Sequence, residues 1–372
     1  MKPRRIVALL LCLVMAAVLL AACNNNDNPA VESSTPPSEA PPSSAPPSSA
    51  PPASDAPPAA SDPPPVVDPG APTVYVIVKA MGNAYWGILQ AGAIDAGKDL
   101  GVNVIITGIP DEARIEDQIT LLQNAVSAKA DAILIAVADS RAQAPEVEKA
   151  YDTGIPIVVI DTMPGTDKYT ASFVTDNYAA GEAAAKELIR LLKDEKHIPE
   201  TQSGTIAVQI GSTGSQTILD RNEGFKDYWD ANAPAAWVVM WDKMQVNDGD
   251  IPRAVGIAQN VLTSEPELLA MFAPNNGSTV GCVTALDEMN RTDIVMLGFD
   301  FSRDIEEMIR AGNFTVSTML QNQYFMGYDG VAAALSILSG GSVAKDNDTG
   351  LTVVNASNVD DPEVIIAAYG GR

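Results

Sequence analysis

The stretch that decides the fold runs from Thr73 to Gln90 and reads TVYVIVKAMGNAYWGILQ. Its first part, Val74–Val78, is a short apolar run rich in β-branched residues, which predicts a buried strand. A Gly-Asn turn follows, and helical spacing of apolar residues then continues over Tyr85–Leu100. The stretch is therefore a strand, a loop and a helix.

The predicted loop carries two adjacent aromatic residues, Tyr85 and Trp86. A large aromatic side chain at the carboxyl end of a strand is well placed to stack on a flat apolar face of a ligand. The alternative is that one of the two packs beneath the helix.

The rest of the chain repeats this alternation of apolar runs and helical patterns, with a charged break at Lys193–Thr201 between five runs and five more. The predicted strands are Val74–Val78, Val102–Ile106, Ala132–Val137, Ile155–Ile160, Ser172–Val174, Thr205–Ile210, Ala236–Trp241, Leu268–Ala273, Ile294–Phe299 and Phe314–Thr318. Such alternation implies parallel sheets covered by helices on both faces. The expected fold is α/β, with two doubly wound parallel-sheet lobes.

Composition and charge exclude several classes of function. The 372 residues are 46% hydrophobic, which is enough for two domains, and a net charge of −24 disfavours a nucleic-acid partner. Cys282 is the only cysteine beyond residue 23, so no disulfide is expected in the folded part. The single histidine, His197, lies in a charged segment, which excludes a histidine metal cluster and a Ser-His-Asp triad. No catalytic residue, metal or cofactor is therefore predicted.

Residues 1–23 combine a basic start, an apolar stretch and a Leu-Ala-Ala-Cys ending at Cys23. This segment resembles a bacterial lipoprotein signal peptide. The resemblance implies cleavage before Cys23, a diacylglycerol on its thiol and a lipid-anchored extracytoplasmic protein, favouring a Gram-positive cell surface. An uncleaved anchor and ordinary secretory cleavage are the alternatives.

Residues 24–72 predict a disordered tether. Sixteen of the chain's 27 prolines fall between Pro29 and Pro72, among serines and alanines that provide no apolar face. Paired prolines favour extended polyproline II structure. A spacer of this kind would suit a protein that projects from a membrane into a thick cell wall.

Polar residues follow most of the predicted strands. They are Lys79, Asp139, Asp161, Asn275, Asp300 and Gln321, with Arg221 in the helix after the loop Gly211–Ser215. Carboxyl ends of parallel strands lie along one edge of a sheet, so these residues are expected to converge. Mixed acids, amides and cations suit vicinal hydroxyls, each of which both donates and accepts a hydrogen bond. The alternative is that they cap helices, which is the interpretation favoured for Ser302 and Asn276.

Several motifs resemble the ribose/galactose type of sugar-binding protein, which has the type I periplasmic binding protein fold and serves ABC importers. They are Asn83-Ala-Tyr-Trp86, Ile155-Pro-Ile-Val-Val-Ile-Asp161, Thr175-Asp-Asn177, Arg221-Asn-Glu-Gly-Phe225, Phe272-Ala-Pro-Asn-Asn276, Gly298-Phe-Asp300 and Gln321. The resemblance covers about residues 73–358. It implies that the sugar is touched by Asn83, Tyr85, Trp86, Asp161, Arg221, Asn275, Asp300 and Gln321.

The chain departs from the ribose pattern at three positions. Lys79 replaces a small serine, Ala136 an asparagine and Thr162 an arginine. A neutral pentose, hexose or cyclitol therefore remains open as the ligand. Lys79 either contacts the ligand or pairs with Asp139, and Trp241 is the candidate for an aromatic residue from the second lobe.

The resemblance also implies two lobes joined by a three-segment hinge, with crossings near Asp176, Gln321–Asn322 and Asp348. The first lobe is expected to comprise residues 73–175 and 322–348, and the second residues 176–321 and 349–372. Closure on a sugar would present a surface to the permease and ATPase subunits of an ABC importer. Alternatives are a receptor for a sugar-like signal coupled to a sensor kinase or chemoreceptor, and an exported α/β enzyme, for which the sequence lacks a nucleophile–base pair.

Overall fold

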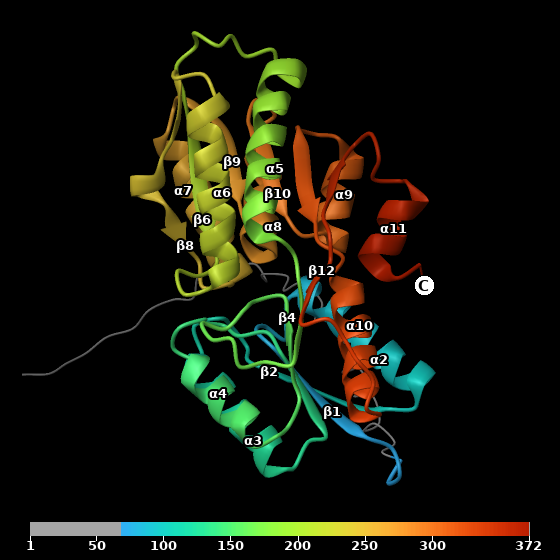
Figure 1. Ribbon diagram of the computed structural model, residues 1–372. Coiled ribbons are helices and arrows are strands. Elements are labelled where there is room, and N and C mark those ends of the chain that lie inside the picture. Colours follow the sequence, from blue (N-terminus) through green and yellow to red (C-terminus); the bar gives the residue numbers. More distant parts are fainter. Residues whose placement is uncertain (1–67, 372) are drawn as a thin grey trace, which may run out of the picture. The chain divides into compact units, whose positions relative to one another are not determined.

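The computed structural model describes residues 68–371, which are coloured in Figure 1. The expected signal peptide, Cys23 and the tether as far as residue 67 lie outside the described residues. Residues 68–72, assigned above to the tether, instead form a turn held by Asn103. The Asn103 amide group donates to the carbonyl oxygens of Asp68 and Ala71 and accepts from the Asp68 N–H. This part of the tether prediction is therefore wrong, because a distant side chain binds the turn.

The first of two sheets has six strands in the order β12-β5-β4-β3-β1-β2, and all its pairs are parallel. Its strands are β1 Thr73–Val78, β2 Asn103–Gly108, β3 Ala132–Ile135, β4 Ile157–Ile160, β5 Ala171–Val174 and β12 Asp346–Asp348. Val74, Val76 and Val78 pack on one face and Ile77 on the other, in separate buried clusters. Both faces are covered, which explains why the central strands β3 and β4 are continuously apolar.

The second sheet has the order β13-β11-β10-β9-β6-β7, and β8 pairs with the last residues of β6, after those that pair with β7. Its strands are β6 Gly204–Ile210, β7 Trp237–Val239, β8 Gln245–Val246, β9 Leu268–Ala273, β10 Val295–Phe299, β11 Val316–Leu320 and β13 Thr352–Asn355. Only the β11–β13 pair is antiparallel among the described pairs of this sheet. Two parallel-dominated α/β sheets confirm the predicted fold class.

Helices cover both faces of each sheet (Figure 1). They are α2 Ala84–Leu100, α3 Ile115–Ser127, α4 Ala144–Asp152, α5 Asn177–Arg190, α6 Gln216–Asn232, α7 Ile251–Ser264, α8 Asn276–Glu288, α9 Arg303–Ala311, α10 Gln323–Leu338 and α11 Pro362–Tyr369, with a π-helical turn at Leu191–Glu195 and a 3₁₀ turn at Trp241–Lys243. Within residues 68–371, none of them has the length and apolar character needed to span a membrane.

One closely packed helix pair in each lobe depends on glycine. A Cβ atom on Gly92 of α2 would lie 2.0 Å from the Tyr324 carbonyl oxygen of α10, and one on Gly327 would lie 2.0 Å from that of Leu89. In the second lobe α5 and α6 meet in the same way: a Cβ on Gly181 would lie 2.2 Å from the Arg221 carbonyl oxygen. The backbones of each pair can approach only because a side chain is missing.

The chain passes between the two sheets at three segments: residues 175–176, residues 321–322 and residues 349–351. The last of these joins β12 to β13, two strands that were not predicted. An Asp-Asn-Asp sequence favours a solvated loop, but Asp346–Asp348 pairs with β5 and its Asp346 carboxylate accepts from Tyr169 and Ser172. Tertiary pairing therefore overrides the local preference of these residues.

Candidate functional site

A pocket lies at the carboxyl ends of the strands and is lined by residues of both lobes. It is lined by Lys79, Asn83, Tyr85, Trp86, Glu112, Asp161, Ser215, Thr217, Ile218, Arg221, Asn275, Asn276, Asp300 and Gln321. Nine of the ten residues predicted to bind the ligand are in this set, and Asp139 is not.

The two central acids occupy equivalent places in the two lobes. Asp161 directly follows β4 and Asp300 directly follows β10, and both have a left-handed backbone, with φ of 61° and 71°. Aspartate tolerates this conformation better than most residues. The carboxylates are buried, and each lobe thus supplies one acid to the pocket.

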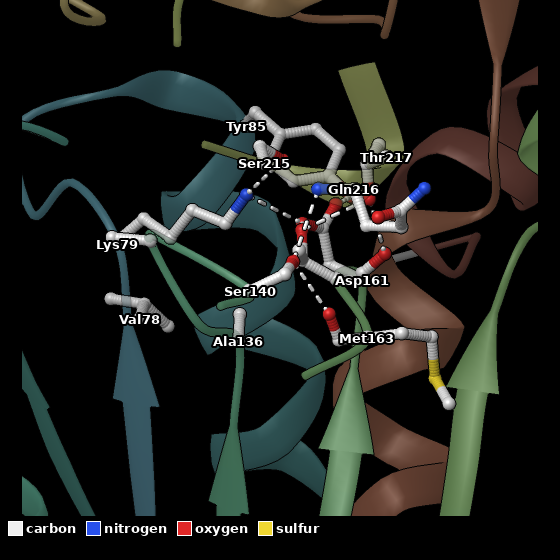
Figure 2. Close-up of polar contacts among 12 residues, drawn as sticks. Val78, Lys79, Tyr85, Ala136, Ser140, Asp161, Met163, Ser215, Gln216 and Thr217 are labelled. Atoms are coloured by element: carbon white, nitrogen blue, oxygen red, sulfur yellow. Dashed lines mark hydrogen bonds and ion pairs between the residues drawn. The ribbon is translucent and has the colours of Figure 1, made fainter. Parts of the chain in front are cut away.

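Asp161 organises the polar groups of the first lobe (Figure 2). Its carboxylate accepts from the Tyr85 hydroxyl at 2.7 Å and from the Thr162 hydroxyl at 2.6 Å. The Lys79 ammonium lies 3.4 Å from the same carboxylate, in an ion pair that is about 95% buried on both sides. Burial, followed by the nearby Asp161 charge, raises the pKa of Tyr85 well above its ordinary value. Tyr85 therefore stays protonated and acts as a donor.

Tyr85 and Trp86 are in the first turn of α2, and not in a loop as predicted. Asn83 caps this helix by accepting the Tyr85 N–H on its side-chain oxygen, which fixes where the helix begins. The two rings meet edge to face, with centroids 5.0 Å apart. Both side chains are buried in the apolar cluster beneath α2 and both line the pocket, so each has a structural role and faces the site.

Arg221 is held rigidly in the second lobe. Its guanidinium donates to the Asn177 side-chain oxygen at 2.9 Å, the Pro274 carbonyl at 2.7 Å and the Gln321 side-chain oxygen at 2.8 Å. It also lies over the Phe299 ring, 4.3 Å from the centroid. With 1% exposure it is among the largest fully buried side chains, and its position is set by three hydrogen bonds and a stacking contact.

Asp300 is linked to Arg221 by a chain of hydrogen bonds that passes through Gln321. The Gln321 amide N–H donates to the Asp300 carboxylate while its oxygen accepts from Arg221. Burial raises the pKa of Asp300 to about 6, although Arg221 and Gln321 oppose the rise. The desolvated carboxylate is therefore a strong acceptor for a ligand hydroxyl near neutral pH.

Three asparagines supply amide groups. The side-chain oxygens of Asn83 and Asn275 are occupied by the Tyr85 N–H and the Ser278 hydroxyl, respectively. Asn276, expected only as a cap, is the first residue of α8 and lines the pocket. Its amide donates to Ser302, while its buried side-chain oxygen has no hydrogen-bond partner among the described residues.

Asp139 serves a different purpose from the one predicted. Its carboxylate accepts the backbone N–H groups of Arg141 and Ala142, and so caps the turn after β3. Lys79 pairs with Asp161, so the alternative pairing with Asp139 is wrong. Trp241, the candidate aromatic from the second lobe, packs edge to face on Phe225 and does not line the pocket.

Sequence reasoning missed Glu112, Ser215, Thr217, Ile218 and Asn276. Ser215 ends the polar loop after β6, and Thr217 and Ile218 follow it in the first turn of α6. These three residues could have been predicted by extending the search for pocket residues from the end of each strand into the next helix. Glu112 comes four residues after β2 ends, whereas the prediction considered only residues directly after each strand. Asn276 is also a polar residue after a predicted strand, but it was interpreted as a helix cap.

The lobes also touch each other directly beside the pocket (Figure 2). The Ser140 N–H donates to the Gly214 carbonyl at 3.0 Å, and the Ser140 hydroxyl accepts the Gln216 N–H at 3.0 Å and donates to the Met163 carbonyl at 2.7 Å. The Thr217 hydroxyl donates to the Asp161 carbonyl at 3.1 Å. The Ser140–Met163 bond lies within the first lobe, and we call the other three bonds the closure contacts, because they join segments that belong to different sheets.

Comparison with known proteins identifies the family. Residues 74–342 match the family described as periplasmic binding protein domain. The chain belongs to this family. Its fold is that of a type I periplasmic binding protein, and the resemblance noted from the sequence motifs is confirmed.

Relatives of this binding protein carry names that refer to sugars. A D-ribose/D-allose-binding protein of Pseudomonas aeruginosa is 28% identical over 291 residues, covering 75% of this chain and 86% of that protein. A ribose import binding protein of Bacillus subtilis is 26% identical over 273 residues, covering 73% of this chain and 84% of that protein.

Solved structures of similar proteins include two with bound sugars. A carbohydrate transporter solute-binding protein from Agrobacterium radiobacter, in complex with D-arabinose, has a TM-score of 0.76 and 29% identity, covering 81% of this chain and all of that one. An ABC transporter solute-binding protein from Agrobacterium vitis, with bound D-fucose, has a TM-score of 0.69 and 34% identity, covering 78% and 98%.

The site of this binding protein is suited to holding a small polar molecule. Within residues 68–371, no group of three or more histidine, cysteine, aspartate or glutamate side chains is arranged to bind a metal ion. Cys282 is a buried free cysteine whose thiol donates to the Gln209 side-chain oxygen at 3.4 Å, and burial raises the pKa of this thiol to about 12. The remaining chemistry is a set of fixed donors and acceptors around an indole face.

Proposed function

We propose that this protein captures a neutral monosaccharide, either a pentose, a hexose or a cyclitol, between its two lobes and delivers it to an ABC permease with its ATPase. The observation that supports this most strongly is the convergence of Trp86, Asp161, Arg221 and Asp300 on one pocket. Buried acids accept sugar hydroxyls, while Arg221 and the asparagines donate to sugar oxygens. The sugar-binding relatives and the bound arabinose and fucose of similar structures support the same ligand class.

The hinge of this proposal would comprise the three crossing segments, which are hydrogen-bonded to one another. The Thr175 hydroxyl lies 3.2 Å from the Gln321 side-chain oxygen and 3.1 Å from the Thr349 hydroxyl. The Asn322 amide binds the Thr349 carbonyl, and the Asp176 N–H donates to Asp348. A few residues at such positions can absorb the backbone rotation of lobe closure.

Anchoring at Cys23 belongs to the same proposal. A lipid on its thiol would hold the protein at the outer face of the cell membrane, with residues 24–67 as a spacer. Metabolic labelling with a radioactive or clickable fatty acid, compared between the wild type and Cys23→Ser, tests this point. Loss of the label in the variant is expected, and retention would overturn the anchor.

The experiment that tests the function is a thermal-shift and calorimetric screen of the full chain against D-ribose, D-allose, D-arabinose, D-fucose and myo-inositol. D-ribose 5-phosphate is the control, because the pocket already contains three acids against two cations. A neutral sugar at 100 times its Kd should stabilise the protein by about 2.7 kcal/mol. Failure of every neutral sugar to bind would overturn the proposal, as would turnover of a bound sugar.

A further inference from the structure

Glu112 is a pocket acid without a partner. It lies in the loop between β2 and α3, is 9% exposed and lines the pocket. Its carboxylate accepts no hydrogen bond and forms no ion pair with any residue of the described range 68–371. The other two acids of the pocket are both engaged: Asp161 holds Lys79 and Tyr85, and Asp300 holds Gln321.

A loop of the second lobe, at Asp248 and Gly249, contacts Glu112. The Glu112 N–H donates to the Asp248 carbonyl at 3.3 Å. Gly249 lies against the side chain, since a Cβ atom there would be 3.2 Å from the Glu112 Cγ. With the backbone of residues 248–249 against Glu112, the pocket is where a polar partner can reach the carboxylate.

At 9% exposure the Glu112 side chain has lost most of its contact with water, which is unfavourable for a carboxylate when no protein donor replaces the lost hydrogen bonds. Burial raises the pKa of Glu112, and Asp161 and Asp248 act in the same direction. The cations Lys79 and Arg221 lower it, without cancelling the rise. A ligand hydroxyl that donated to this carboxylate would restore what burial removes.

We propose that Glu112 is a specificity-determining residue that accepts a hydrogen bond from one hydroxyl group of the bound sugar. The proposal rests on the proposed function, since it adds a contact to the same pocket. Its consequence is selectivity: an analogue without that hydroxyl leaves the acid buried and unpaired, and such sites reject deoxy analogues strongly.

The test combines variants with deoxy analogues. The proteins are the wild type, Glu112→Ala, Glu112→Gln and a control, Glu116→Gln, which removes the same charge from an exposed position four residues away in α3. The probes are the sugar among D-ribose, D-allose, D-arabinose and D-fucose that binds the wild type most tightly, and each of its monodeoxy analogues. Calorimetry gives the Kd of each pair, and unfolding without sugar shows that each variant folds.

The expected result is a coupling between one residue and one hydroxyl. Glu112→Ala should weaken the parent sugar about 10- to 100-fold, Glu112→Gln less, and Glu116→Gln less than twofold. One monodeoxy analogue should bind the wild type at least tenfold more weakly than the parent sugar does. The variant Glu112→Ala should bind that analogue and the parent sugar with about the same Kd.

Three results would overturn the inference. If the Glu112 variants match Glu116→Gln in affinity, or if every deoxy penalty is the same in the wild type and Glu112→Ala, the residue reads no hydroxyl while the sugar-binding function stands. If no sugar binds the wild type, the proposed function and this inference both fall. Should Glu112→Ala not fold, the same comparison with Glu112→Gln decides.

Discussion

Replacing Asp300 by asparagine should make the ligand-free protein more stable at pH 8, relative to its stability at pH 4, and should weaken the sugar complex. Asp300 is 3% exposed, and burial raises the pKa of its carboxyl from 3.8 to about 6. Between these two pH values the folded chain retains a proton that the unfolded chain releases. The free energy of unfolding therefore falls as the pH rises from about 4 to about 6. The substitution Asp300→Asn would remove this loss, since an amide does not titrate.

The size of the effect follows from the two pKa values. At about 1.4 kcal/mol for each pKa unit, a change from 3.8 to about 6 corresponds to about 3 kcal/mol. Asp300→Asn should thus gain about 3 kcal/mol over the wild type at pH 8, relative to the difference between the two proteins at pH 4. The side-chain oxygen of asparagine still accepts from Gln321, so the existing chain of hydrogen bonds is retained.

Urea denaturation of both proteins without sugar, at several pH values from 4 to 8, measures this difference. The difference between the two proteins cancels groups that titrate equally in both. Sugar affinity should move the opposite way: at pH 8 the variant loses about 10- to 100-fold, because a neutral amide replaces a charged acceptor. A stability difference that stays flat across this pH range would refute the account of Asp300, as would undiminished affinity.

Three further substitutions test the packing and the closure contacts. Trp86→Ala should abolish measurable sugar binding and lower the free energy of unfolding by about 3 kcal/mol, because its ring is also part of a buried cluster. Gly92→Ala should lower the free energy of unfolding, measured by urea denaturation, by about 2 kcal/mol, because its Cβ would clash with α10. Gly87→Ala is the control in the same helix, since its Cβ would meet nothing within 4 Å and should not destabilise the protein. Equal effects of the two substitutions would contradict the packing account. Ser140→Ala removes one closure contact, the bond from the Gln216 N–H, together with the Ser140–Met163 bond within the first lobe, and should raise the calorimetric Kd about five- to tenfold. An unchanged Kd would show that this closure contact does not favour the bound form.

The fold could be predicted because its information is local. A strand covered on both faces must be apolar at every position, and Ala132–Ile135 and Ile157–Ile160 meet this condition in full. The edge strand Asp346–Asp348 could not be predicted, because it depends on Tyr169 and Ser172, which are about 175 residues away. The residues around Asp346–Asp348 give no indication that such distant partners exist.

The site was predicted less completely, for a different reason. A polar residue after a strand either faces the pocket or caps a turn, and the two uses require the same residue types. Asp161 and Asp139 both follow strands of the first sheet, but a left-handed backbone accompanies Asp161 in the pocket, while two backbone N–H groups bind Asp139. Backbone conformation separates these cases, and it depends on the loops that follow.

Gln321 shows why pocket and hinge cannot be treated separately. It lies on a crossing segment, yet its side chain accepts from Arg221 and Thr175 and donates to Asp300. A ligand that binds Arg221 and Asp300 therefore contacts groups whose positions depend on a residue between the lobes. Because Gln321 is 1% exposed, a rotation at this crossing must change at least one of its three hydrogen bonds or move Arg221 and Asp300 with it. Under the proposed function, sugar binding and lobe closure would then be two consequences of one buried network, and a ligand would shift the equilibrium only by the difference in its contacts between the open and closed forms.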